Sequence, residues 1–223
     1  MKLRANKAII ISAIAITVIA AIIAACSVSS CRSRLNFSAT FYYVCYDSPA
    51  AETSASSISS AVHSYGGAGY IIESGGEYYV TVSCYYNQND ARSVCEALNK
   101  KGLKCAVLEV ETGDYYLNGN AKSNENLYLG NLNTLLSLSE MCYNLANSLD
   151  GFSCDQTAAK ALLSDVRFGL DGLARNNSSN CFSREIAALR AECEDVAQGY
   201  VLSHDVRRLQ IAITDCIVNV ELY

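Results

Sequence analysis

The chain has 223 residues, of which 51% are hydrophobic and one is proline, so it is neither disordered nor low in complexity. All 22 acidic residues lie beyond residue 34, whereas the charged residues within 1–34 are all basic. This acidic main part has no attraction for a phosphate backbone, which argues against nucleic acid as a partner.

Residues 8–28 are predicted to form a membrane anchor. The run Ala8–Ala25 contains no charged side chain. As a helix this run rises about 27 Å, and residues 26–28 extend it, so it can cross a bilayer core of about 30 Å. Lys2, Arg4 and Lys7 precede the run, which places a tail of residues 1–7 in the cytoplasm and the bulk of the chain outside it.

Cys26 leaves an alternative open for the anchor. The sequence Ile23-Ala24-Ala25-Cys26 resembles the lipobox of bacterial lipoproteins, in which the cysteine is lipidated and becomes the new N-terminus. The apolar run is longer than the usual signal-peptide core of roughly 7–15 residues, which favours an uncleaved transmembrane helix. In both cases the protein stays at the cell membrane, by a single-pass helix or by a lipid on Cys26 after a signal that ends at Ala25.

The eleven cysteines also allow two interpretations. Ten of them remain at or beyond Cys31, an even number that suits disulfide pairing in an oxidising compartment. Free cysteines also behave as small apolar residues of a core. No C-x-x-C pair and no Cys/His spacing typical of zinc occurs, so we expect no metal site and no cofactor.

Segment 37–111 contains an internal duplication. Each copy reads as a strand, a helix, a glycine turn and a second strand. The two copies begin at Tyr42-Tyr43-Val44 and at Tyr78-Tyr79-Val80, and their glycine turns lie at Gly66-Gly67 and at Gly102. The order β-α-β-β-α-β predicts an α+β fold, with one antiparallel sheet and both helices on one face.

The second copy carries a family resemblance. Its strand Tyr78–Tyr85, the following Asn89–Arg92 and the segment Leu98–Leu103 resemble the SPOR (sporulation-related repeat) domain family. The sequence departs from the family pattern at Ser83, where glycine is usual, and at Cys84, where serine is usual. The resemblance implies an RNP-like fold, found on single-pass envelope proteins of cell division or sporulation. It also implies binding of peptidoglycan glycan strands without stem peptides, through the sheet face that the helices leave open.

Side-chain alternation predicts which residues lie on that open face. The residues expected to face the two helices are Tyr42, Val44, Tyr46, Tyr78, Val80, Val82, Cys84, Ala106 and Leu108. The residues expected to face outward include Phe41, Ser83, Tyr85, Cys105 and Glu109. The expected glycan-binding residues are Tyr43, Cys45, Ser48, Glu77, Tyr79, Thr81 and Val107. Tyrosine rings can cover the apolar faces of sugars, and a disulfide between Cys45 and Cys105 on this face would compete with binding.

The rest of the chain is predicted to be a linker, residues 112–123, and an all-α helical bundle, residues 124–223. Apolar residues recur there at helical spacing in four stretches joined by short connections, which predicts an antiparallel arrangement. The bundle resembles no family that we recognise. We expect it to bind a protein partner.

No catalytic site is expected. His63 and His204 are interpreted as solvated or capping histidines, and acid pairs such as Glu192 and Asp195 as solvated charges. The sequence therefore predicts a non-catalytic, membrane-anchored protein of the bacterial cell envelope that binds peptidoglycan glycan strands. The alternative is an envelope scaffold whose repeat unit and helical tail bind proteins rather than glycan.

Overall fold

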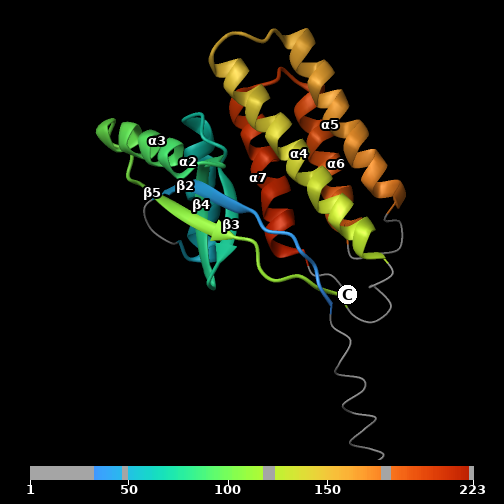
Figure 1. Ribbon diagram of the computed structural model, residues 1–223. Coiled ribbons are helices and arrows are strands. Elements are labelled where there is room, and N and C mark those ends of the chain that lie inside the picture. Colours follow the sequence, from blue (N-terminus) through green and yellow to red (C-terminus); the bar gives the residue numbers. More distant parts are fainter. Residues whose placement is uncertain (1–32, 47–49, 118–123, 177–181, 221–223) are drawn as a thin grey trace, which may run out of the picture.

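The computed structural model describes residues 33–46, 50–117, 124–176 and 182–220, which form an α+β fold (Figure 1). The elements in chain order are β1 (Ser33–Arg34), β2 (Thr40–Tyr46), α2 (Glu52–Ser64), β3 (Tyr70–Ser74), β4 (Glu77–Tyr85), α3 (Gln88–Lys100), β5 (Cys105–Glu111), β6 (Tyr116–Leu117), α4 (Glu125–Asp150), α5 (Gln156–Asn176), α6 (Phe182–Gln198) and α7 (Ser203–Asn219). The predicted tail and anchor lie outside the described residues. Within those residues, no helix combines the length and the apolar character that a membrane crossing requires.

The predicted antiparallel sheet is confirmed. The strands of the two copies form one four-stranded sheet in the order β3-β4-β2-β5. The helices of the two copies cover the same face. Val44 of β2 packs with Ala91 and Cys95 of α3, and Val80 of β4 packs with Ala55 and Val62 of α2. The alternation of apolar residues in β2 and in the first half of β4 therefore places side chains as the sequence predicts.

A β-bulge reverses the alternation in the second half of β4. Val44 pairs with Ser83 and Cys45 pairs with Thr81, so Val82 has no partner on β2. Such an extra residue shifts the following side chains to the other face. The predictions for Ser83, Cys84 and Tyr85 are therefore wrong. Ser83 is paired with Val44 on the helix side, Cys84 lies in the cluster opposite the two helices, and Tyr85 packs with α3.

The predicted orientation of β5 is also wrong. Residues directly opposite each other in a sheet share a face, and Val44 pairs with Val107 while Tyr46 pairs with Cys105. Cys105 and Val107 therefore pack with α3, whereas Leu108 packs on the opposite face. Because Cys45 and Cys105 lie on opposite faces of the sheet, the disulfide considered for this pair is not formed.

The C-terminal stretches form the four predicted helices, α4 to α7. Their apolar stripes are buried together, and α4 packs along α7 while α5 packs along α6. The predicted linker contains a short strand, because β6 pairs with β1 in a separate two-stranded sheet. The chain segment between β5 and the bundle is thus partly held by the residues that precede β2.

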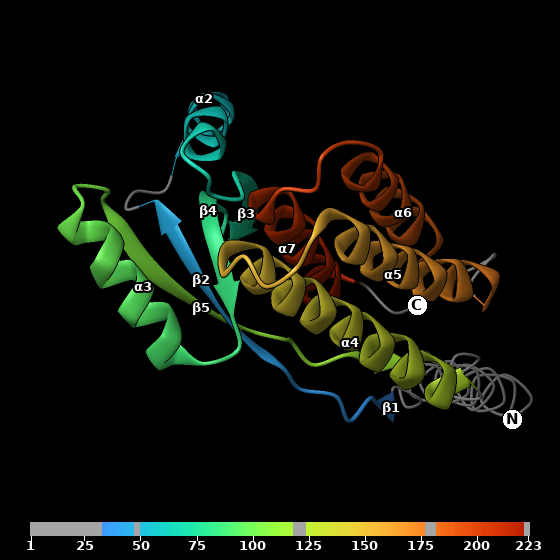
Figure 2. The ribbon, with the colours of Figure 1, turned by 90° about the horizontal axis from the view of Figure 1, so that it is seen from above.

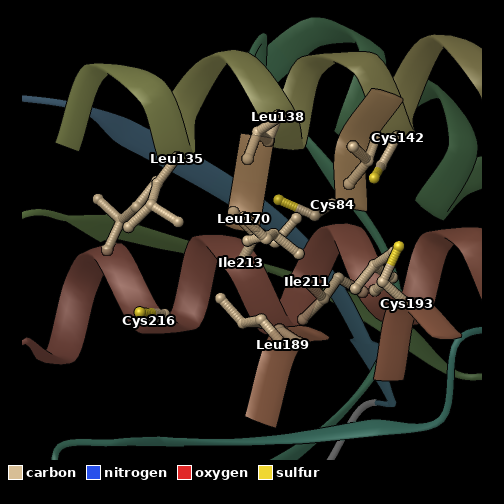
Figure 3. Close-up of a cluster of buried hydrophobic side chains, with 14 of the residues drawn as sticks. Cys84, Leu135, Leu138, Cys142, Leu170, Leu189, Cys193, Ile211, Ile213 and Cys216 are labelled. Atoms are coloured by element: carbon tan, nitrogen blue, oxygen red, sulfur yellow. The ribbon is translucent and has the colours of Figure 1, made fainter. Parts of the chain in front are cut away.

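The bundle does not stand apart from the sheet. Viewed from above, α2 and α3 lie on one side of the sheet, and α7 and α4 lie on the other with α5 and α6 beyond them (Figure 2). Figure 3 shows Cys84 of the sheet in the same buried cluster as Leu138 of α4 and Ile213 of α7. One continuous core therefore joins the repeat unit to the helical tail, and α7 is its central element.

The close approach of α2 to the sheet depends on glycine at position 69. A Cβ atom there would lie 2.6 Å from the carbonyl oxygen of Ser59 and 3.1 Å from Cβ of His63. The backbone at Gly69 also has a positive φ of 62°, which favours glycine. Gly75 in the β3–β4 turn has almost the same φ, 63°, but a Cβ there meets nothing within 4 Å.

These two glycines give a matched pair of variants. Alanine at either position should cost about 1–2 kcal/mol, because an L side chain disfavours the left-handed region. Gly69→Ala should cost a further 1–3 kcal/mol or so, because the added methyl group forces α2 away from the sheet. Denaturant unfolding of the full-length chain in detergent measures both. Equal losses in the two variants would contradict the tight contact at Gly69.

Candidate functional site

The predicted glycan-binding residues do not form an open surface. Tyr43, Cys45 and Thr81 lie on the predicted face, but they are only 1%, 1% and 0% exposed, because α7 covers that face. Val107 is turned toward α3, and Ser48 lies outside the described residues. In this arrangement Tyr43, Cys45 and Thr81 are inaccessible to a ligand, and Val107 faces away from the predicted surface. The glycan-binding role of the predicted residues stays a prediction.

Two of the predicted residues stay accessible at the start of β4. Glu77 is exposed, and Tyr79 is half-buried at the edge of the cluster under α7. The Tyr79 hydroxyl donates a hydrogen bond to Oε2 of Glu77 at 2.8 Å. Glu77 and Tyr79 therefore form a small polar corner at the start of β4 rather than an extended open face that could bind a glycan strand.

Polar contacts fix α7 on the sheet at its centre. The Tyr43 hydroxyl donates to Oγ1 of Thr214 at 3.0 Å, and Nε2 of Gln210 donates to the carbonyl oxygen of Cys84 at 3.2 Å. Both contacts are buried. Burial raises the pKa of Tyr43 well above its ordinary value, and the nearby Cys84 acts in the same direction. The phenol therefore remains a neutral donor toward α7.

A second set of contacts holds α7 against β3. The Tyr70 hydroxyl donates to Oδ2 of Asp215 at 3.1 Å, and the guanidinium of Arg208 lies 5.8 Å from the centre of the Tyr70 ring. Arg208 also pairs with Glu192 of α6 at 3.0 Å. Burial raises the pKa of Asp215, while its hydrogen bond from Tyr70 acts in the opposite direction. The edge of the sheet is thus tied to two helices of the bundle.

The loops at one end of the bundle expose an aromatic patch, defined here as Phe152, Tyr200 and Leu202. Phe152 is 95% exposed and has a positive φ of 54°, and Tyr200 is 72% exposed. The patch borders a groove of about 530 Å³ between the α4–α5 and α6–α7 loops. Gln156 at the start of α5 holds the α6–α7 loop in place, because its side chain forms two hydrogen bonds with the backbone of Val201, at 2.8 and 2.9 Å.

Both histidines of the chain meet at the junction of α2 and α7. Nε2 of His63 lies 3.0 Å from Oδ1 of Asp205, and Nε2 of His204 lies 3.7 Å from the same oxygen. The two rings are edge-to-face with their centres 4.5 Å apart. Burial lowers the pKa of His204, and Asp205 acts in the opposite direction. No sequence pattern predicts this cluster, because residues 63 and 204 meet only once α7 covers the sheet.

No family model matches the chain, no curated protein matches its sequence and no solved structure matches its fold. The SPOR resemblance therefore stays a prediction.

The hydroxyl groups of Tyr43 and Tyr79 allow a test of the α7 contact. Tyr43→Phe should lower the free energy of unfolding by about 1 kcal/mol, because it removes a buried hydrogen bond to Thr214. Tyr79→Phe removes an exposed bond to Glu77 and should change stability by less than about 0.5 kcal/mol.

Denaturant unfolding of both full-length variants measures the difference, and Thr214→Val in a double-mutant cycle with Tyr43→Phe assigns it to the contact. Additive effects in that cycle would show that α7 does not rest on Tyr43 in solution.

Proposed function

We propose that the protein is a membrane-anchored, non-catalytic scaffold of the bacterial envelope whose repeat unit and helical bundle bind proteins. The observation that carries this proposal is the position of α7 on the sheet. The face that a glycan strand would need is filled by a helix of the same chain, with Tyr43 and Gln210 bonded across the contact. The aromatic face of this repeat unit therefore serves as a surface that binds polypeptide.

The aromatic patch supports a partner-binding role for the bundle. Large aromatic side chains dominate the binding energy of protein interfaces, and Phe152 and Tyr200 stand exposed on either side of a groove. A phenylalanine with positive φ costs about 1–2 kcal/mol of backbone strain. Since Phe152 gains almost no burial in return, we infer that a partner protein inserts an apolar side chain between these rings.

The state of the reactive groups supports a non-catalytic role. Burial raises the pKa of the Cys45 thiol to about 12 and that of Cys193 to about 11, so neither is a ready nucleophile. Glu192 pairs with Arg208, and Asp171 pairs with Arg190 at 2.6 Å. Each of these acids is neutralised by an arginine of a neighbouring helix, including Glu192, which also lines a cavity with Tyr70 and Asp215.

The membrane attachment in this proposal rests on the sequence of residues 8–28. The basic residues before that run favour an extracytoplasmic position for the described residues. The lipid alternative at Cys26 leads to the same location.

Glycan-strand binding is the second candidate. It is favoured by the β-α-β-β-α-β order of the repeat unit and by the accessible pair Glu77 and Tyr79 at the start of β4. In this alternative α7 must leave the sheet before a strand can bind, because Tyr43 and Thr81 are covered.

Sedimentation with sacculi separates the two candidates. The full-length chain in detergent should stay in the supernatant with sacculi stripped of stem peptides, as with untreated sacculi. Tyr79→Ala and Tyr78→Ala, which alter opposite faces of β4, should change nothing. If the chain pellets more strongly after stem-peptide removal and Tyr79→Ala alone abolishes this, glycan binding replaces the scaffold proposal.

Site-specific photo-crosslinking tests the aromatic patch. A photoreactive phenylalanine analogue at position 152 should form one discrete, protease-sensitive adduct in cells, because a partner covers this side chain. The control position is Phe168 of α5, which is 70% exposed but lies over Arg175 rather than on the groove. The proposal predicts loss of the adduct in a Tyr200→Ala background. Equal adducts at positions 152 and 168 would show that exposure alone governs the reaction.

A further inference from the structure

The cluster of His63, His204 and Asp205 has the composition and spacing of a metal site. The chain contains two histidines in all, and both direct Nε2 toward the same carboxylate oxygen. One ligand atom from each of the three residues lies within 4.8 Å of the others. His204 adds a second imidazole nitrogen 3.7 Å from the same oxygen, so the cluster contains more than one hydrogen-bonded His–Asp pair.

The distances fit a tetrahedral ion. Zinc binds imidazole nitrogen and carboxylate oxygen at about 2.0–2.2 Å, which sets neighbouring ligand atoms roughly 3.3–3.5 Å apart in a tetrahedron. The separations of 3.0 and 3.7 Å from Oδ1 of Asp205 lie on either side of this value. The ligand nitrogens of the two histidines lie within 4.8 Å of each other, and side-chain rotation has to bring all three ligand atoms to tetrahedral spacing when an ion binds.

The fold holds His63 firmly. Its helix, α2, is pressed against the start of β3 at Gly69, where any larger residue would meet His63 and Ser59. The Ser59 hydroxyl donates a hydrogen bond to the carbonyl oxygen of Gly69, which fixes the helix at this contact. A ligand on a rigid element needs little reorganisation to bind an ion.

The other two ligands are held from the bundle side. His204 and Asp205 lie in the first turn of α7, and Gln156 fixes Val201, two residues before that helix begins. The nearby cation Arg207 is engaged with Asp150, at 2.5 Å.

We propose that His63, His204 and Asp205 bind a divalent transition-metal ion, with Zn²⁺ as the best match for two imidazoles and one carboxylate. All three side chains are partly exposed, so an ion can enter from solvent and keep a fourth position for water. The ion joins α2 of the repeat unit to α7 of the bundle and so fastens α7 on the sheet. This assignment does not depend on the scaffold function.

Calorimetric titration of the full-length, chelator-treated chain with Zn²⁺ tests the proposal. The chain should bind one ion at this site, and its melting temperature should rise with Zn²⁺ because the ion binds only the folded form. Mg²⁺ should produce no such rise, because it prefers oxygen ligands. His63→Ala and His204→Ala should each weaken Zn²⁺ binding at least about tenfold, since even indirect partners of a metal ligand cost roughly 10–100-fold.

Two controls keep the test decisive. Asp205→Asn preserves the shape and the hydrogen bond to His63 while removing the anionic ligand, so it should fold normally and still lose Zn²⁺ affinity. The Co²⁺-substituted protein should lack the absorption of a thiolate-bound ion, which separates this site from the cysteines. The proposal is overturned if Zn²⁺ does not bind, or if the double variant His63→Ala/His204→Ala binds it as tightly as the natural chain.

Discussion

The structure depends on covering a sheet that is apolar on both faces. In β2, Val44 packs toward α3 while Phe41, Tyr43 and Cys45 pack the other way, so neither face can remain in water. The repeat unit supplies helices for one face only. Helix α7 supplies the other cover, and α4 to α6 in turn bury the outer side of α7. Sheet and bundle therefore form one core, although the chain order suggests two separate units.

This constraint also shapes what the surface can do. The tyrosines that could contact a sugar chain already donate hydrogen bonds to α7, Tyr43 to Thr214 and Tyr70 to Asp215. Gln210 of the same helix donates to the backbone of Cys84. Accessible groups of the described residues include a corner at Glu77 and Tyr79, the aromatic patch around Phe152 and the junction of His63 and His204. Each lies at the margin of the α7 contact or at the end of the bundle, where side chains are not buried in the core.

Local patterns predicted the elements well, because each depends on neighbouring residues. Tyr and Val alternation identified β2 and β4, and the stripe of Ala91 and Cys95 identified α3. What failed depends on pairing between distant residues. The bulge at Val82 and the register of β5 are set by partners on β2, and the sequences of β4 and β5 do not predict them. For the same reason the cover over Tyr43 and the meeting of His63 with His204 could not be predicted: both require the docking of α7.

The short pairing of β1 with β6 has a mechanical consequence. Leu35 bonds through its amide to the carbonyl of Tyr115 at 2.9 Å, Arg34 pairs with Asp114, and the Tyr115 hydroxyl donates to the carbonyl of Ile217 at the end of α7. A force applied to the chain ahead of Ser33 therefore acts first on this clamp, the pairing of β1 with β6 and its bond to α7. The load reaches β2, in the middle of the sheet, only after the clamp has opened.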